Sequence, residues 1–206
     1  MKKETKRLVF IITALFVLVI SGFWIFYKDK HEHQTEQAFG SSIDSYNGVT
    51  VFYNGNSNGY IKGRNITNDG YNLGLKYQCV EFVKRYYYEY LHHKMPNSHG
   101  NAKDFYNKSL MDGHRNLQRD LIQYRNPSKT KPKVNDLIIF AGNKFNPFGH
   151  VAIISKVADN EIEIVQQNTG STRATLALIK NVDGWKVTGN SLGWAKINCL
   201  GWLRKE

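Results

Sequence analysis

Apolar residues recur at helical spacing in the segment that follows Tyr77. They occupy positions 79/80, 82/83, 86/87 and 90/91, with polar residues between them. This period of three to four residues is the pattern of an amphipathic helix with one buried face. Cys79 is the first apolar residue of the run, so the pattern places its thiol at the N-terminus of a helix.

Runs of β-branched and aliphatic residues in the second half of the chain indicate strands instead. Residues 149–157 read as a buried strand, and a short turn separates them from a second strand at 161–165. A hairpin returns the end of its second strand to the start of its first. We therefore expect the side chains of His150, Gln166 and Asn168 to lie close together.

The remaining pattern completes one α+β domain. Residues 48–53 look extended, residues 54–74 form a long Gly- and Asn-rich loop, and the apolar spacing within 101–124 suggests one or two helices. Strands are expected to dominate from residue 134 to 178 and again from 196 to 203. The length after the N-terminal region, about 160 residues, fits a single domain with a sizeable core.

The N-terminal region predicts a membrane anchor. Residues 8–27 carry no charge, and 20 apolar or neutral residues are long enough to cross a bilayer as a helix. Four basic residues precede this stretch, so the positive-inside rule places the N-terminus in the cytoplasm and the rest of the chain outside. The alternative is a signal peptide cleaved before Gly22, after which the protein would be secreted. The aromatic residues at 23–27 favour a retained single-pass anchor.

These assignments divide the chain into a cytoplasmic tail with anchor at 1–30, a polar spacer at 31–46 and a catalytic domain at 47–206. His31 and His33 lie in the spacer without partnering ligands, so we expect no metal site and no cofactor. The net charge of +11 favours anionic partners, such as the cell wall and lipid headgroups. The basic residues are scattered and no reader motif is present, so we expect no nucleic-acid binding.

Cys79 is a candidate nucleophile. A helix N-terminus favours an anion and lowers a thiol pKa, which yields the thiolate that attacks carbonyl carbon. His150 is a candidate base 71 residues later. The alternatives are a buried, inert cysteine and a structural histidine at a strand start. Cys199 fits a buried strand position, and we expect no disulfide between the two cysteines.

The motifs around these residues resemble the papain-like CHAP amidase family, and in particular the amidase domain of glutathionylspermidine synthetase/amidase. The resemblance runs from about Gly48 to Trp202. It is carried by four segments: Gln78-Cys79-Val80-Glu81-Phe82, Gly149-His150-Val151-Ala152-Ile153-Ile154, Gln167-Asn168 and Leu200-Gly201-Trp202. It implies a papain-like α+β fold, with the cysteine helix packed on an antiparallel sheet. It also implies hydrolysis of an amide bond, usually in peptidoglycan peptides and in one branch in a polyamine–glutathione conjugate.

One position departs from that family. Where the family usually carries Glu-Gln-Asn, this chain has Gln166-Gln167-Asn168. A neutral amide orients an imidazole but stabilises its protonated form less than a carboxylate does. In the mechanism that the resemblance and the residue chemistry suggest, Cys79 attacks, His150 carries the proton and Gln166 orients His150. The backbone N–H of Cys79 with the side chain of Asn168 or Gln78 would bind the oxyanion.

Two classes of function follow from the sequence. The first is a membrane-anchored cysteine amidase or endopeptidase that acts on peptidoglycan, with a glutathionylspermidine-type amidase as the alternative within that class. The second is a catalytically silent wall-binding module, which the missing carboxylate at Gln166 suggests. Faster labelling of Cys79 than of Cys199 by a thiol reagent would favour the first class.

Overall fold

The computed structural model describes residue 7 and residues 12–24, 37–55, 61–189 and 198–206. The chain divides into two compact units, Met1–Gln37 and Ala38–Glu206. In the first unit, residues 12–24 are helical and their side chains are exposed. Residues 8–11 and 25–27 of the expected anchor lie outside the described residues. Across the described ranges, no helix has both the length and the apolar character needed to cross a membrane.

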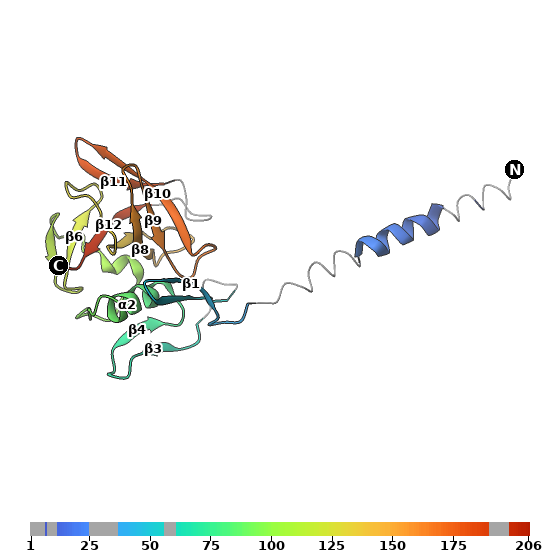
Figure 1. Cartoon of the computed structure of the whole chain (residues 1–206), viewed down its shortest axis with the longest axis horizontal. Helices are drawn as coiled ribbons and strands as arrows, with labels where there is room; N and C mark the ends of the chain where they lie inside the picture. The colour runs from blue at the N-terminus through green and yellow to red at the C-terminus, as the bar shows by residue number, and fades with distance from the viewer. Residues whose placement is uncertain (1–6, 8–11, 25–36, 56–60, 190–197) are drawn as a thin grey trace. The chain divides into compact units, whose positions relative to one another are not determined.

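The second unit is built on an antiparallel sheet of eight strands in its described part, shown in Figure 1. The spatial order is β11-β10-β9-β8-β7-β12-β6-β5, so neighbours in sequence are mostly neighbours in space. The bounds are β5 (His114–Asn116), β6 (Leu121–Arg125), β7 (Leu137–Phe140), β8 (His150–Val157), β9 (Glu161–Val165), β10 (Arg173–Asn181), β11 (Gly184–Thr188) and β12 (Cys199–Arg204). The expected run of strands after residue 134 is confirmed.

The helix predicted at Cys79 is confirmed as α2 (Cys79–Glu89), which packs on the central strand β8. Alternation along β8 gives the sheet two apolar faces. Val151 and Ile153 join the core under α2, which also contains Phe82 and Val83. The arrangement confirms an α+β fold with the cysteine helix on an antiparallel sheet.

The opposite face of the sheet encloses a second core. Ala152 and Ile154 of β8 pack there with Ile164 and the fully buried Trp202. Every buried member of this cluster lies on a strand of the same sheet. The sheet therefore curls and packs on itself, so that β8 is covered on both faces and its first residue is held in a fixed position.

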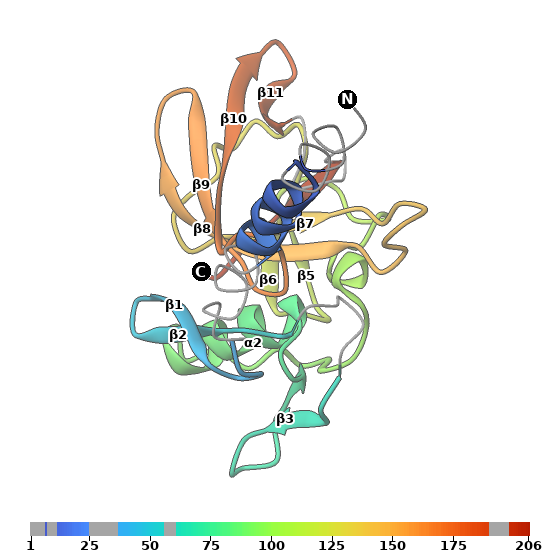
Figure 2. The ribbon, with the colours of Figure 1, turned by 90° about the vertical axis from the view of Figure 1, so that its right-hand side faces the viewer.

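Two small hairpins contact α2, and Figure 2 shows the β1–β2 pair beside this helix. They are β1 (Ser42–Tyr46) with β2 (Val49–Phe52), and β3 (Arg64–Ile66) with β4 (Asn72–Leu75). The expected spacer at 31–46 is therefore too long, because the compact unit begins at Ala38. Ile43 and Tyr46 of β1 pack against the core, which explains why this polar-looking stretch is ordered.

The expectation of one or two helices in residues 101–124 is wrong. The segment contains only the single 3-10 turn η1 (Ala102–Phe105), followed by β5 and the start of β6. The side-chain oxygen of Asn116 accepts the backbone N–H of Gln118, and Asp120 takes a positive φ of 54°, which are features of turns. The apolar residues here are too widely spaced to bury one face of a helix.

Candidate functional site

Cys79 is the first residue of α2, with Gln78 as an extended N-cap residue. Its side chain is half-buried. The backbone N–H groups of Cys79, Val80 and Val151 lie close enough to the sulfur to favour its ionised form, against the larger effect of burial. The first two belong to the helix N-terminus, whose N–H groups have no intrahelical partners. The third belongs to the residue after His150, so the thiol lies against the beginning of β8.

His150 begins β8 and meets the end of β9, as the hairpin pattern predicts. Its Nε2 lies 3.0 Å from Oε1 of Gln166. The pairing of β8 with β9, Ile153 opposite Val165, brings these two positions together. Gly149 comes directly before His150 with a φ of 76°, and a Cβ there would lie 2.5 Å from the carbonyl oxygen of Phe140. Only glycine allows this close approach.

The amide of Gln166 is held in one orientation. Its Nε2 donates to the carbonyl oxygen of Ser171 at 3.0 Å, which leaves Oε1 facing the imidazole. An amide oxygen accepts hydrogen bonds only, so Nε2 of His150 carries the proton in this contact. In the neutral ring, Nδ1 of His150 is then the unprotonated nitrogen. This is the tautomer in which Nδ1 can accept a proton.

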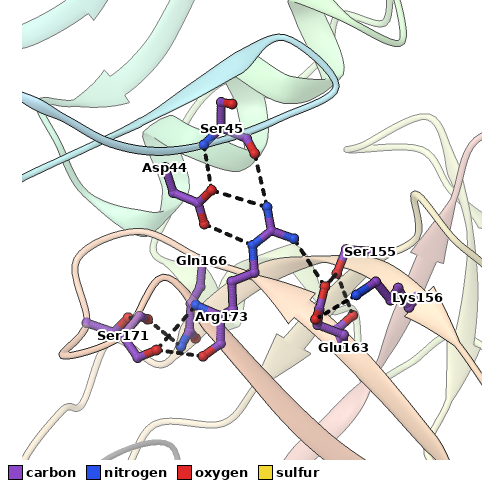
Figure 3. A network of polar contacts seen from close by, with 9 residues as sticks. Asp44, Ser45, Ser155, Lys156, Glu163, Gln166, Ser171 and Arg173 are labelled. Carbon is purple, nitrogen blue, oxygen red and sulfur yellow. Dashed lines mark hydrogen bonds and ion pairs between the residues drawn. The ribbon is translucent and has the colours of Figure 1, made fainter.

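A network of polar contacts supports this orientation, as Figure 3 shows. Oγ of Ser171 donates to the carbonyl oxygen of Arg173 at 2.6 Å. The guanidinium of Arg173 bonds both carboxylate oxygens of Asp44 on β1, and it bonds Glu163 on β9 at 3.1 Å. Arg173 lowers the pKa of the Asp44 carboxyl through this hydrogen bond. The network joins β1 to β9 and β10, the two strands on either side of Gln166 in sequence.

Asn168 lies at the other end of the same short segment and contacts Gln78. Its Nδ2 donates to Oε1 of Gln78 at 2.5 Å, and its Oδ1 accepts from Asn54 at 2.9 Å. The two residues expected at the oxyanion are therefore neighbours, beside the N-terminus of α2. All five expected site residues lie at the junction of α2, β8 and the end of β9.

Burial sets the charge state of the two central groups. It raises the pKa of the Cys79 thiol, although the three backbone N–H groups act in the opposite direction. It lowers the pKa of His150 to about 4, against the hydrogen bond that His150 donates to Gln166. The lowering of the thiol pKa that the helix N-terminus was expected to cause is outweighed by burial. Desolvation of each charge outweighs the local dipole, so the neutral thiol and neutral imidazole are favoured.

The sequence interpretation missed two buried residues next to this site. Glu81 is in the first turn of α2 and Gln167 follows Gln166, and both side chains are almost inaccessible to solvent. Gln167 Nε2 donates to Oε2 of Glu81 at 2.8 Å. The signal available in the sequence was a carboxylate two residues after Cys79, within the predicted helix. In the structure, residues 81–87 of that helix are all buried.

A groove of about 490 Å³ lies close to the start of β8. Its lining includes Lys103, Lys108 and Ala141, the residue after Phe140. The backbone N–H of Lys103 donates to Phe148, and the ring of Phe140 stacks on that of His150 at 6.1 Å between centroids. Within the described ranges, no group of three or more His, Cys, Asp or Glu residues could hold a metal ion.

Comparison with protein families finds a match to part of this chain. Residues 68–168 match the family model of the CHAP domain. This range contains α2 with Cys79, β8 with His150, and the segment from Gln166 to Asn168. The match confirms the resemblance seen in the sequence, and CHAP domains are typically cysteine amidases or peptidases.

Two curated proteins are similar to part of this chain. Trypanothione synthetase from Crithidia fasciculata is 30% identical over 116 residues, which are 56% of this chain and 18% of that protein. Glutathionylspermidine synthase from the same organism is 31% identical over 101 residues, which are 48% of this chain and 14% of that protein. The chain therefore covers less than a fifth of the length of either relative.

Proposed function

We propose, from the match of residues 68–168 to the CHAP domain, that this chain hydrolyses amide bonds through a covalent acyl-enzyme, with Cys79 as the nucleophile and His150 as the general base. The observation that carries the proposal is the position of the thiol. The thiol lies near the backbone N–H of Val151, the neighbour of His150, and Nε2 of that imidazole is bonded to Gln166. A thiol, a base and an orienting amide on one junction are the arrangement that nucleophilic catalysis requires.

The chemistry begins from the neutral pair that burial favours. The thiol of Cys79 transfers its proton to Nδ1 of His150 as the sulfur forms a bond to the carbonyl carbon. The tetrahedral intermediate collapses when the C–N bond breaks, and the imidazolium gives the proton to the departing amine. Water then attacks the thioester with His150 again accepting a proton, which releases the carboxylic acid and restores the thiol.

The oxyanion binds at the N-terminus of α2. The donors that we propose are the backbone N–H of Cys79 and the side-chain amide of Gln78. Oε1 of Gln78 accepts a hydrogen bond from Nδ2 of Asn168. Asn168 acts in this arrangement by fixing the rotamer of Gln78. Donors that are fixed before the reaction stabilise developing charge without the cost of reorganisation.

Peptidoglycan peptides are the substrate that we propose first. They carry free carboxylates, and the lysines of the groove near His150 suit an anionic substrate. The net charge of +11 favours accumulation at an anionic wall. This function requires the domain to lie outside the cytoplasm, held at the membrane by residues 8–27 or secreted after cleavage.

A conjugate of glutathione with spermidine is the second candidate. The two relatives by name act in glutathionylspermidine and trypanothione synthesis, and their similarity to this chain supports an amide of that kind. Glutathione also carries free carboxylates, so the groove lysines suit either substrate. A wall-binding module without turnover is the third alternative, and it predicts that neither substrate is cleaved.

The test is to incubate the full chain separately with purified peptidoglycan and with glutathionylspermidine, and to identify the released amines by mass spectrometry. We expect amines from peptidoglycan, and none from the His150→Ala variant, which keeps the thiol but lacks the base. Release from glutathionylspermidine alone would select the second candidate. No release from either substrate would contradict hydrolysis and support the silent module.

A further inference from the structure

The side-chain amide of Gln167 makes four hydrogen bonds, which satisfy both of its N–H donors and its oxygen. It is 1% exposed. Oε1 accepts the backbone N–H of Phe52 at 2.7 Å and a guanidinium N–H of Arg85 at 3.5 Å. Nε2 donates to Glu81 at 2.8 Å and to the carbonyl oxygen of Gln78 at 3.1 Å. Each donor and acceptor of the amide therefore has a partner, and its orientation is fixed.

Two of these bonds end at the first turn of α2. The N-cap residue Gln78 makes no side-chain cap, and its carbonyl oxygen accepts both the helix bond from Phe82 at 3.2 Å and the bond from Gln167. A helix start without a local cap depends on other groups for its position. Here those groups come from residues 167 and 168, far away in sequence.

Glu81 makes this attachment rigid. Its carboxylate is completely buried, and it bonds Nε of Arg85 at 2.6 Å and the amide of Asn65 at 2.7 Å. A buried ion pair is stable only when its remaining lone pairs are satisfied. Gln167 satisfies one of them, so moving Gln167 would leave a buried charge short of a partner.

We propose that Gln167 is a positioning residue that sets the distance between Cys79 and His150. Gln166 is bound to His150 and Gln167 is bound to the residues on either side of Cys79, and the two are consecutive in the chain. The peptide between them therefore ties the base to the helix that carries the nucleophile. This inference rests on the proposed function, in which the thiol gives its proton to His150.

The experiment compares Gln167→Ala with Gln123→Ala in the full chain. Gln123 is an equally buried glutamine, 0% exposed, whose amide makes three hydrogen bonds with Asn107 and Asn116. It is the matched control for the loss of a buried amide. Three quantities are measured: the rate of Cys79 alkylation by iodoacetamide, read by peptide mass spectrometry; kcat and KM for the amide substrate; and Tm.

We expect both variants to lower Tm, and Gln167→Ala alone to slow alkylation and kcat by about tenfold or more, because misplaced reacting groups are costly. KM should change by less than about twofold. Equal alkylation rates and equal kcat values in the two variants would overturn the proposal. If the wild type cleaves no amide but Gln167→Ala slows an alkylation that requires His150, positioning holds and the proposed function fails.

A second variant covers the case in which Gln167→Ala does not fold. Gln167→Asn keeps an amide in the buried site, but its reach is one methylene shorter, so it cannot bond Phe52 and Gln78 together. We expect the same two rates to fall, by a smaller factor. Wild-type rates in a folded Gln167→Asn protein would also overturn the proposal.

Discussion

The start of α2 and the start of β12 each carry a cysteine, and the two places give the thiols different chemistry. Cys79 is half-buried and has three backbone N–H groups near its sulfur, including that of Val151. Cys199 is buried on a strand inside the curled sheet, where its Sγ faces the carbonyl oxygen of Gly201 at 3.9 Å. Burial raises the pKa of Cys199 to about 12. The helix terminus, together with Val151 of β8, brings three backbone N–H groups near the sulfur of Cys79, whereas the strand brings one, from Gly201, near that of Cys199.

The difference teaches that burial alone does not decide reactivity. Burial raises the pKa of both thiols. Cys79 has backbone N–H groups from two segments near its sulfur, including that of Val151 beside His150, whereas Cys199 has that of Gly201 alone. The N–H groups near Cys79 are already in place before proton transfer, so the transfer requires little reorganisation.

The largest expected effect separates the two cysteines by activity. Cys79→Ala should abolish amide hydrolysis, because no other group can form the acyl-enzyme, while Cys199→Ala should retain the wild-type rate. Hydrolysis is followed by the release of amines, and folding by circular dichroism. Turnover that survives in Cys79→Ala would refute covalent catalysis at this residue.

The second prediction concerns thiol labelling and its dependence on pH. Cys79 should react with iodoacetamide at least about 100-fold faster than Cys199 at neutral pH. A thiol is neutral below its pKa. Because the pKa of Cys79 is raised and that of His150 is about 4, the thiolate fraction of Cys79 should grow with pH across the neutral range. We expect the labelling rate to rise about tenfold per pH unit in that range.

Rates measured by peptide mass spectrometry at several pH values decide this point. A plateau from about pH 5 to pH 8 would mean that the thiolate–imidazolium pair already exists in the resting site. Equal, slow labelling of both cysteines would remove the contrast between them and support the silent wall-binding module.

A smaller effect is expected when Gln166 is changed to the carboxylate usual in the family. Gln166→Glu should stabilise the imidazolium, raise the pKa of His150 from about 4 and increase Cys79 labelling near pH 6 by up to roughly tenfold. The carboxylate loses the N–H bond to Ser171 and places an oxygen there instead. We therefore expect a loss of about 1–3 kcal/mol in the free energy of unfolding.

The pH profiles of labelling and hydrolysis, with urea unfolding as the stability measurement, test this variant. Gln166→Asn is its control, because it keeps an amide but shortens its reach. If Gln166→Glu folds and its activity nevertheless collapses, then the bond to Ser171, rather than the charge beside His150, is what the site requires.

The features that local pattern determines were predictable. The apolar period after Tyr77 indicates a helix beginning at Cys79, and the two strands around residue 159 bring His150 to Gln166 through a hairpin. The helix and the hairpin each depend on residues that are close together in sequence, so their patterns can be read from the sequence itself. Family motifs added the chemistry expected at those positions.

The remaining features depend on contacts between distant segments. Ser42–Tyr46 reads as a polar spacer, yet Ile43 and Tyr46 find a core to pack on. Glu81 and Gln167 are partners 86 residues apart in sequence, so neither residue shows its role alone. The charge state of Cys79 follows from desolvation in the folded chain, which outweighs the helix terminus that the sequence does show.

The smallest predicted effect concerns stability. Here we expect the larger effect from Cys199, the reverse of the order expected for activity. Cys199→Ala removes a sulfur from the packed interior of the sheet and should lower the free energy of unfolding by about 1 kcal/mol. Cys79→Ala removes a thiol that is only half-buried, so it should lower the free energy of unfolding by less. Urea unfolding of both variants measures the difference, with the wild type as reference. A larger loss for Cys79→Ala would mean that its sulfur stabilises the start of α2, and the contrast between a reactive and a packing cysteine would then have to be abandoned.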